Sequence, residues 1–302
     1  MKTPVIFIVF RRPKTTRLVF EAIKQAQPPQ LYLVADGPRG PNDVADCESV
    51  REVLTDIDWP CEVTRDFADT NLGVANRVTS GITSAFALYE EAIILEDDTL
   101  PCPFFFEYCE SLLCQWRNEE RVQHISGSNF IHNRKADIPH SYYFNNHPSI
   151  WGWATWRRAW KHYQLGLPNW PQHKADGLLD RKLKTKAAKQ CWEQTLDLHY
   201  DNNDPWTWDF QWTYATWAQD GLAIAPRQNL VSNIGFGDAA THTSTATAPD
   251  LPIHLNHSEE ILHPPEPRIE PNLNLVLEKH IHRKQPNKFQ RSLSKIRSLL
   301  PI

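Results

Sequence analysis

The sequence lacks the short motifs that mark several common classes of protein. It contains no GxGxxG and no GxxxxGK[ST] loop, which argues against a dinucleotide-dependent enzyme and against a nucleotide hydrolase. Its six cysteines form no CxxC pair, and no histidine stands at a spacing that would complete a zinc site. A chain of 302 residues does not need disulfides for its stability, so we expect free thiols in a reducing compartment.

Long apolar runs are missing as well. The first one, VIFIVF at 5–10, is shorter than the core of a signal peptide and is followed by Arg11 and Arg12. No segment approaches the roughly 20 apolar residues that a membrane-spanning helix requires. The net charge of −4 does not indicate a nucleic-acid partner. We therefore expect a cytoplasmic protein that does not bind nucleic acid.

Positive charge is concentrated at the C-terminal end. Residues 279–302 hold seven lysines and arginines and no acidic residue, and 288–300 place apolar residues at helical spacing between basic ones. This pattern allows a solvated helix that packs on its own domain, or a basic amphipathic helix on the inner face of an anionic membrane. Proline is frequent from Pro249 onward, so we expect an irregular wrap before this helix.

Apolar strands alternate with amphipathic helices in the first hundred residues. The patterns predict strands at 5–10, 31–35, 61–67 and 92–96, and helices at 15–26, 43–55 and 74–89. This alternation predicts an α/β fold with a mostly parallel central sheet. In such sheets ligands bind beyond the carboxyl ends of the strands. We expect one domain at 1–248, with a nucleotide-binding half at about 1–120 and an acceptor half at about 121–248.

Tryptophan is concentrated in the second half. Ten of the twelve tryptophans lie between Trp151 and Trp217. Such a cluster indicates either an aromatic core or a platform for flat ligands such as sugar rings. The stretch WTWDFQWTYATWAQDG predicts a helix that ends at Gly221.

Three consecutive carboxylates, Glu96, Asp97 and Asp98, end the fourth predicted strand. Like charges this close repel and raise one another's pKa, and a bound divalent cation would remove that cost. Carboxylate oxygens suit Mn²⁺ or Mg²⁺, which usually also take phosphate oxygens from a substrate. The alternative is a helix N-terminus, in which one of the two aspartates or Thr99 caps a helix that starts near Pro101.

Three further polar residues each allow two interpretations. Arg77 could contact phosphate or could lie on the surface of its helix. Asp209 lies among three tryptophans; it could accept a proton from a hydroxyl, or it could be hydrogen-bonded for structural reasons. His242, in the loop GDAATHT, could be a ligand or incidental.

The order of the motifs resembles that of GT-A glycosyltransferases. LVADGPR, NLGVANRVTSGI, ILEDDTLPCPFFFEYCESLL, SIWGWATWRRAW, WDFQWTYATW and THTS follow one another between about residue 4 and residue 245. The same order is found in bacterial sugar transferases of the glycosyltransferase family 2-like type and, more distantly, in N-acetylglucosaminyltransferase I. The resemblance implies a Rossmann-like GT-A fold.

The resemblance also implies roles for the candidate residues. Asp98 would hold Mn²⁺ or Mg²⁺, and His242 would touch the metal or the diphosphate. Asp36, at the end of the second predicted strand, would contact the nucleotide base. The candidate contacts of the nucleotide sugar are Arg11, Arg12, Asp36, Arg77, Glu96, Asp97 and Trp153.

The implied activity is a hexosyl- or N-acetylhexosaminyltransferase of polysaccharide biosynthesis. It would move a sugar from a UDP-sugar to a hydroxyl of a carbohydrate acceptor, with inversion and with Asp209 as base. The related segment of N-acetylglucosaminyltransferase I reads Trp-Asp-Asp-Trp and uses its second aspartate, whereas this chain has Phe210 and Gln211 after Asp209. The alternatives are a sugar nucleotidyltransferase, a non-catalytic carbohydrate-binding protein and a metal-dependent hydrolase. A sugar nucleotidyltransferase usually carries a glycine-rich N-terminal loop, and the segment FRRPKTT of this chain contains no glycine.

Overall fold

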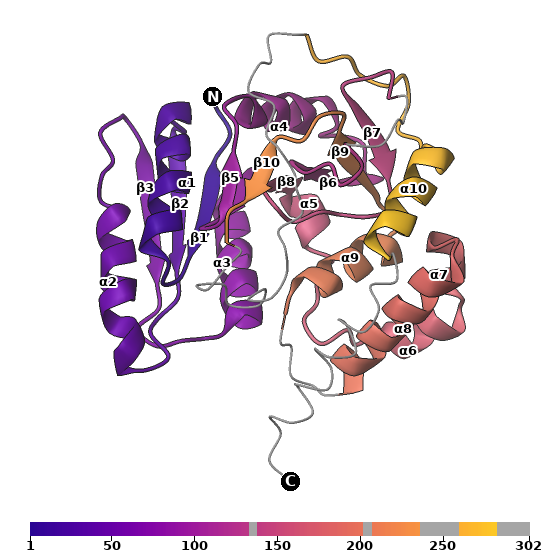
Figure 1. Cartoon of the computed structure of the whole chain (residues 1–302), viewed down its shortest axis with the longest axis horizontal. Coiled ribbons are helices and arrows are strands. Elements are labelled where there is room, and N and C mark those ends of the chain that lie inside the picture. The colour runs from indigo at the N-terminus through magenta and orange to yellow at the C-terminus, as the bar shows by residue number, and fades with distance from the viewer. Residues whose placement is uncertain (133–137, 202–206, 236–259, 283–302) are drawn as a thin grey trace.

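The computed structural model describes residues 1–132, 138–201, 207–235 and 260–282. In them an eight-stranded sheet in the order β3-β2-β1-β4-β8-β6-β9-β7 carries helices on both faces (Figure 1). All pairings are parallel except those of β8 with its two neighbours and of β7 with β9. The predicted α/β class with a mostly parallel sheet is therefore confirmed.

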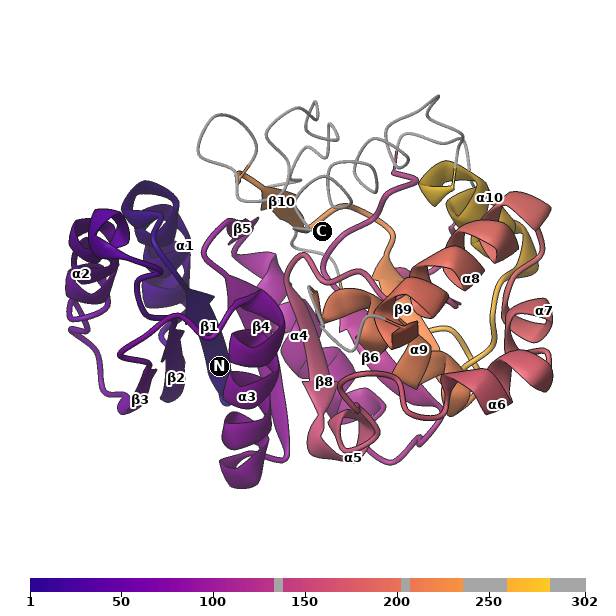
Figure 2. The same cartoon turned by 90° about the horizontal axis from the view of Figure 1, so that it is seen from below.

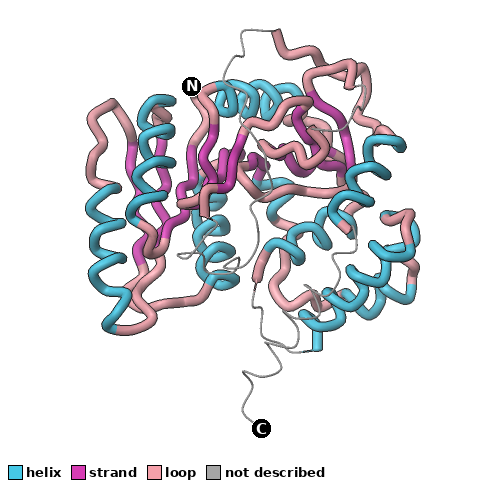
Figure 3. The backbone as a smooth tube through the Cα atoms, viewed as in Figure 1, coloured by secondary structure: helices cyan, strands magenta, loops and turns pink. Residues whose placement is uncertain are grey.

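The N-terminal half is a regular alternation of strands and helices (Figure 3). Its strands are β1 (Val5–Val9), β2 (Gln30–Ala35), β3 (Glu62–Phe67) and β4 (Glu91–Glu96). Its helices are α1 (Pro13–Ala26), the short η1 (Pro41–Asp43), α2 (Val44–Val53) and α3 (Val74–Leu88). The strands and helices predicted for this half are confirmed, with slightly shifted ends.

Strand β1 lies at the centre of this half and is buried on both faces, as its unbroken apolar run predicts. Phe7 joins a core with α1 and α2 on one face of the sheet. Ile6 and Ile8 join a second core with α3 on the other face. Because successive side chains of a strand point to opposite faces, one apolar run supplies both cores.

The C-terminal half is less regular. Its strands are β5 (Thr99–Pro101), β6 (Val122–Ser126), β7 (Tyr142–Asn145), β8 (Trp153–Trp156), β9 (Leu222–Pro226) and β10 (Val231–Asn233). Its helices are α4 (Phe104–Gln115), α5 (Arg157–Trp160), α6 (Trp170–Ala175), α7 (Leu178–Lys182), α8 (Lys186–Asp201), α9 (Asp209–Ala218) and α10 (Pro271–Ile281). Helices α6 to α8 lie at the opposite end of the molecule from α1 and α2 (Figures 1 and 2).

Most of the clustered tryptophans form core, not surface. Fully buried indoles belong to Trp153, Trp156, Trp170, Trp208, Trp212 and Trp217. The ring of Trp153 stacks on that of Trp208, with centroids 5.6 Å apart, and on the imidazole of His124 at 5.1 Å. Of the two interpretations of the cluster, an aromatic core therefore accounts for these six side chains.

The region after Pro249 differs from the prediction where the structure describes it. Helix α10 forms at Pro271–Ile281, within the expected irregular wrap. Pro271 is tolerated because the first residue of a helix needs no backbone N–H partner. Leu273 and Leu277 stabilise the helix by packing against Ala225 and its neighbours. The predicted basic helix at 288–300 and His242 lie outside the described residues.

Two expectations about the whole chain can be checked against the described residues. All six cysteines are free, as predicted. None of the described helices is both long enough and apolar enough to span a membrane.

Candidate active site

A cavity of about 510 Å³ opens at the carboxyl ends of β1, β2 and β4, between α3 and the start of α9. The predicted site residues that line it are Arg12, Asp36, Arg77, Glu96, Asp97, Asp98 and Asp209. Two candidates are not part of its lining: Arg11 pairs with Asp43 at 3.2 Å, and Trp153 is fully buried in the core. The fold thus brings together residues that are almost 200 positions apart in the sequence.

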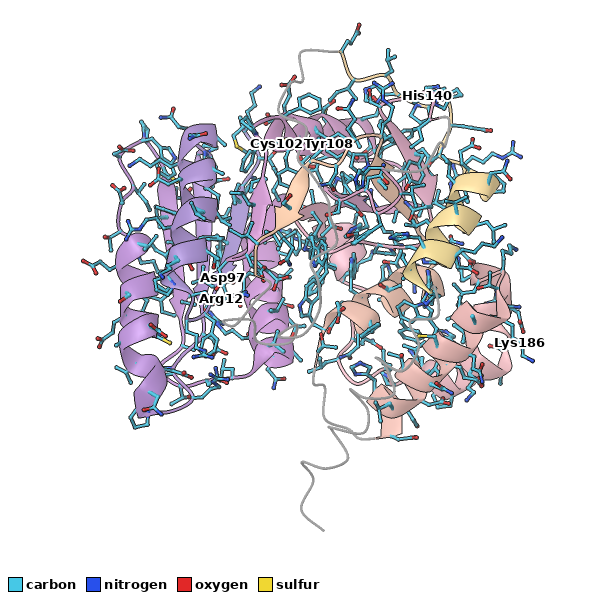
Figure 4. All side chains as sticks on the ribbon, in the orientation of Figure 1. Arg12, Asp97, Cys102, Tyr108, His140 and Lys186 are labelled. Carbon is cyan, nitrogen blue, oxygen red and sulfur yellow. The ribbon has the colours of Figure 1, made fainter. Side chains whose placement is uncertain are left out.

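Arg12 neutralises part of the carboxylate triplet. Arg12 and Asp97 lie side by side (Figure 4), and the guanidinium donates to Asp97. It also forms an ion pair with Asp98, in which Nη1 and Oδ2 are 2.7 Å apart. The backbone N–H of Phe10 donates to the other oxygen of Asp97 at 3.3 Å. Burial alone would lower the pKa of Arg12, but the charges of Asp97 and Asp98 outweigh it and raise this pKa. The counterion of Asp97 and Asp98 is therefore Arg12, which lies between β1 and α1.

Glu96 has a carboxylate whose pKa is strongly raised. Burial, followed by the charges of Asp98 and Asp97, raises the pKa of Glu96 to about 8. Asp209 contributes to the same shift, so the electrostatic field of the triplet and that of α9 meet inside the cavity. A pKa displaced this far in a cavity is typical of a functional site.

Thr99 does not cap a helix, and this part of the alternative interpretation is wrong. Thr99 begins β5, and its hydroxyl accepts from the backbone N–H of Glu96 and donates to the carbonyl of Glu96, both at 2.9 Å. Helix α4 starts only at Phe104, after Pro103. The hydroxyl closes the turn that follows β4, so it fixes the directions in which the triplet's side chains leave the sheet.

Replacing Arg12 by methionine is expected to lower the free energy of unfolding by about 3 kcal/mol, because Asp97 would stay buried without its counterion. Asp97 has only 4% of its side chain exposed. Arg11→Met is the matched control: Asp43 keeps its ion pair with Arg39 at 2.6 Å, so the loss should stay below about 1 kcal/mol. Urea unfolding measures both values, and equal losses would contradict the role given to Arg12.

Asp36 fixes the loop around the cavity. Its carboxylate accepts from the backbone N–H groups of Gly37 and Leu72 and from the side-chain amide of Asn71, each at 2.9 Å. A carboxylate has about four acceptor sites, so one remains for a ligand. Asp36 therefore joins the loop after β2 to the segment before α3. It can still accept one hydrogen bond from a ligand.

Arg77 is not a surface residue. It is buried on α3, its Nη2 lies 2.8 Å from a carboxylate oxygen of Asp66, and its Nε donates to the carbonyl of Ala35 at 3.3 Å. Most of its hydrogen-bonding capacity is used within the protein. Its main effect is to tie α3 to the ends of β2 and β3 beside the cavity.

Asp209 is the first residue of α9. Its negative charge therefore lies at the positive end of the helix dipole, which favours it. The hydroxyl of Thr207 donates to one of its oxygens and fixes the orientation of the carboxylate. Asp209 lines the same cavity as the carboxylate triplet.

Trp151 and Arg39 are among the cavity residues that were not sequence candidates. Trp151 lines the cavity although its neighbour Trp153 is core, because Gly152 between them has a φ of +62° that turns the chain. Arg39 lines it too, with its guanidinium 5.4 Å from the centre of the Phe10 ring. The glycine of the WGW sequence was a signal that Trp151 and Trp153 differ in direction. Nothing in the sequence indicated that Arg39 lines the cavity.

The carboxylates fit a divalent cation that is shared with a ligand. Mg²⁺ and Mn²⁺ prefer oxygen donors and usually combine one or two carboxylates with phosphate oxygens. Glu96 and Asp98 supply such oxygens at the cavity wall. Within the described part of the chain, no group of three or more His, Cys, Asp or Glu side chains could hold a metal alone. Phosphate oxygens of a ligand would therefore have to complete the coordination.

Comparison with known proteins yields structural matches of low similarity. No protein-family model matches the sequence, and no curated protein matches it. The mannosyltransferase PcManGT from Pyrobaculum calidifontis, in complex with GDP-Man and Mn²⁺, matches at 12% identity and a TM-score of 0.40, covering 72% of this chain and 70% of that chain.

Two further solved structures show which kinds of enzyme are among the matches. The galactosyltransferase LgtC, with donor and acceptor sugar analogs, matches at 9% identity and a TM-score of 0.37, covering 71% of this chain and 70% of that one. An apo UDP-glucose pyrophosphorylase matches at 10% identity and a TM-score of 0.40, covering 78% and 93%. The structural matches thus include both glycosyltransferases and a pyrophosphorylase. Similarity at this level says nothing about the substrate, metal or reaction of this chain.

Proposed function

We propose that the protein is a metal-dependent glycosyltransferase. It moves a sugar from a nucleotide sugar, a UDP-sugar by the resemblance of its motifs, to the hydroxyl of a carbohydrate acceptor. The observation that carries this proposal is the joint placement of the carboxylate triplet, Asp36 and Asp209 in one cavity at the carboxyl edge of the sheet. A nucleotide fits the region of Asp36 and Arg39, and the reacting sugar fits between Asp98 and Asp209.

Asp209 acts as the base in this proposal. The acceptor oxygen forms a bond to the anomeric carbon while the bond from that carbon to the diphosphate breaks, and the diphosphate leaves with the electron pair. The proton of the acceptor hydroxyl passes to Asp209. Attack from the face opposite the leaving group inverts the anomeric centre. General-base help of this kind contributes roughly 10²–10⁴-fold to a rate.

The other residues of the cavity neutralise charge or hold the binding groups in place. A divalent cation on Asp98 would neutralise the charge that develops on the diphosphate. Arg12, held by Asp97 and Asp98, keeps these two carboxylates in place before any ligand arrives. Asp36 fixes the loop that the nucleotide would contact.

A thermal-shift screen of nucleoside diphosphates, with and without Mn²⁺, tests the proposal. We expect one diphosphate to stabilise the protein by about 2.7 kcal/mol at a concentration one hundred times its Kd, and to do so only with the metal. Nucleoside monophosphates with the same bases are the control, because they lack the diphosphate. The proposal is wrong if no diphosphate shifts the melting temperature.

The screen separates the competing functions when nucleoside triphosphates with sugar 1-phosphates, and free sugars, are added to it. A sugar nucleotidyltransferase would respond to a nucleoside triphosphate together with a sugar 1-phosphate. A non-catalytic carbohydrate-binding protein would respond to sugars without any nucleotide. Stabilisation by a diphosphate with Mn²⁺ supports the glycosyltransferase over both.

A further inference from the structure

A second cavity, of about 370 Å³, lies next to the first. It is bounded by the start of α9, the segment before β8, the middle of α8 and the end of α10. The two cavities share the residues Ile150, Trp151, Asp209 and Phe210 as a common wall. The proposed base therefore stands where a ligand in the second cavity would meet a sugar held in the first.

The lining of the second cavity is mainly aromatic and aliphatic. Phe130, Trp151, Trp192 and Phe210 supply rings, and Ile150 and Ile281 supply aliphatic surface. Flat apolar surfaces of this kind pack against the C–H face of a sugar ring. Hydroxyl groups come from only two of the described lining residues, Ser149 and Thr213.

One polar side chain in this lining is buried without a partner. His147 is 6% exposed, and no hydrogen bond to its Nε2 is formed within the described residues. Burial, and then the neighbouring His282, lowers the pKa of His147 to about 3, so its ring is neutral and offers one donor and one acceptor. A buried nitrogen without a partner is costly, and a ligand hydroxyl beside it would remove that cost.

We propose that the second cavity binds the acceptor as an uncharged pyranose ring, with its apolar face on the aromatic wall and one hydroxyl hydrogen-bonded to His147. This inference rests on the proposed function, because it assigns the partner of the same reaction. It narrows the acceptor to a neutral sugar at its reacting end. The attacking hydroxyl is then the one next to Asp209, which belongs to the wall shared by the two cavities.

Saturation-transfer difference NMR with methyl pyranosides of common neutral hexoses and N-acetylhexosamines tests this inference. The protein is loaded with the diphosphate that the thermal-shift screen identifies. We expect at least one pyranoside to bind through protons of one ring face. His147→Phe should weaken this binding about tenfold, because the ring hydroxyl loses its partner. His147→Gln, which restores a polar atom, should recover part of it.

Controls separate failure of this inference from failure of the proposed function. His140→Phe is the matched control, because His140 lines neither cavity and its replacement should leave binding unchanged. Thr213→Val, on α9, is the second variant if His147→Phe does not fold, and it should weaken the same pyranoside. Diphosphate binding should persist in every variant.

Three outcomes overturn the inference while the diphosphate still binds. They are no binding of any neutral pyranoside, equal binding by wild type and His147→Phe, and binding only of sugar phosphates or uronic acids. If no diphosphate binds at all, the proposed function itself has failed.

Discussion

Asparagine in place of Asp209 is expected to lower the rate of sugar transfer by about 10²–10⁴-fold and to leave the affinity for the nucleotide sugar unchanged. The substitution keeps the shape of the side chain and an oxygen for Thr207, but removes the group that takes the proton. The measurement is the release of nucleoside diphosphate in the presence of an acceptor, with kcat and KM determined separately. A fall in kcat at constant donor KM is the expected signature.

Asp220→Asn is the matched control for this experiment. Asp220 lies just after the other end of α9, is largely exposed and pairs with Lys182. Its replacement should not change transfer. Asp209 is also the only acidic residue between Trp206 and Gln219, so a one-position shift of the base leaves no other carboxylate in this segment. Full activity of Asp209→Asn would therefore place the base in another element.

Asp98→Ala is expected to abolish the Mn²⁺-dependent part of nucleotide-sugar binding while the fold survives. Asp98 is the more exposed of the two carboxylates on Arg12, and after its removal Arg12 keeps Asp97. Calorimetric titration of the nucleotide sugar, with and without Mn²⁺, measures the loss. Urea unfolding of the same variant should show nearly wild-type stability.

Asp97→Ala provides the contrast. Asp97 is buried and binds both Arg12 and the backbone of Phe10, so its removal should cost stability as well as binding. The two variants thus separate a ligand-binding carboxylate from a structural one. Unchanged affinity of Asp98→Ala for the nucleotide sugar with Mn²⁺ would refute the proposed metal site.

The N-terminal half could be predicted from the sequence because its signals are local. Val5–Val9 and residues 31–35 are continuous apolar runs, and α3 has its buried residues at helical spacing. Strand β2 is followed directly by Asp36 and β4 ends at Glu96, so both strands lead into polar residues at the same edge of a parallel sheet. The positions of Asp36 and of the triplet beside one cavity follow from that rule.

The partners of these residues could not be predicted, because they depend on contacts between distant parts of the chain. The Arg12–Asp97 pair joins the ends of β1 and β4, and composition does not reveal which arginine of the pair Arg11–Arg12 points inward. Trp151 and Trp153 are equivalent by residue type. Only the turn at Gly152 sends one to the cavity and the other to the core.

The wall that the two cavities share has a thermodynamic consequence. A ligand that shifts Trp151 or Phe210 in one cavity changes the shape of the other, so the two binding equilibria are linked. Linkage is reciprocal: the factor by which the first ligand changes the affinity for the second equals the factor in the opposite direction. In the proposed reaction, the indole of Trp151 and the phenyl ring of Phe210 would therefore couple the binding of the donor to that of the acceptor.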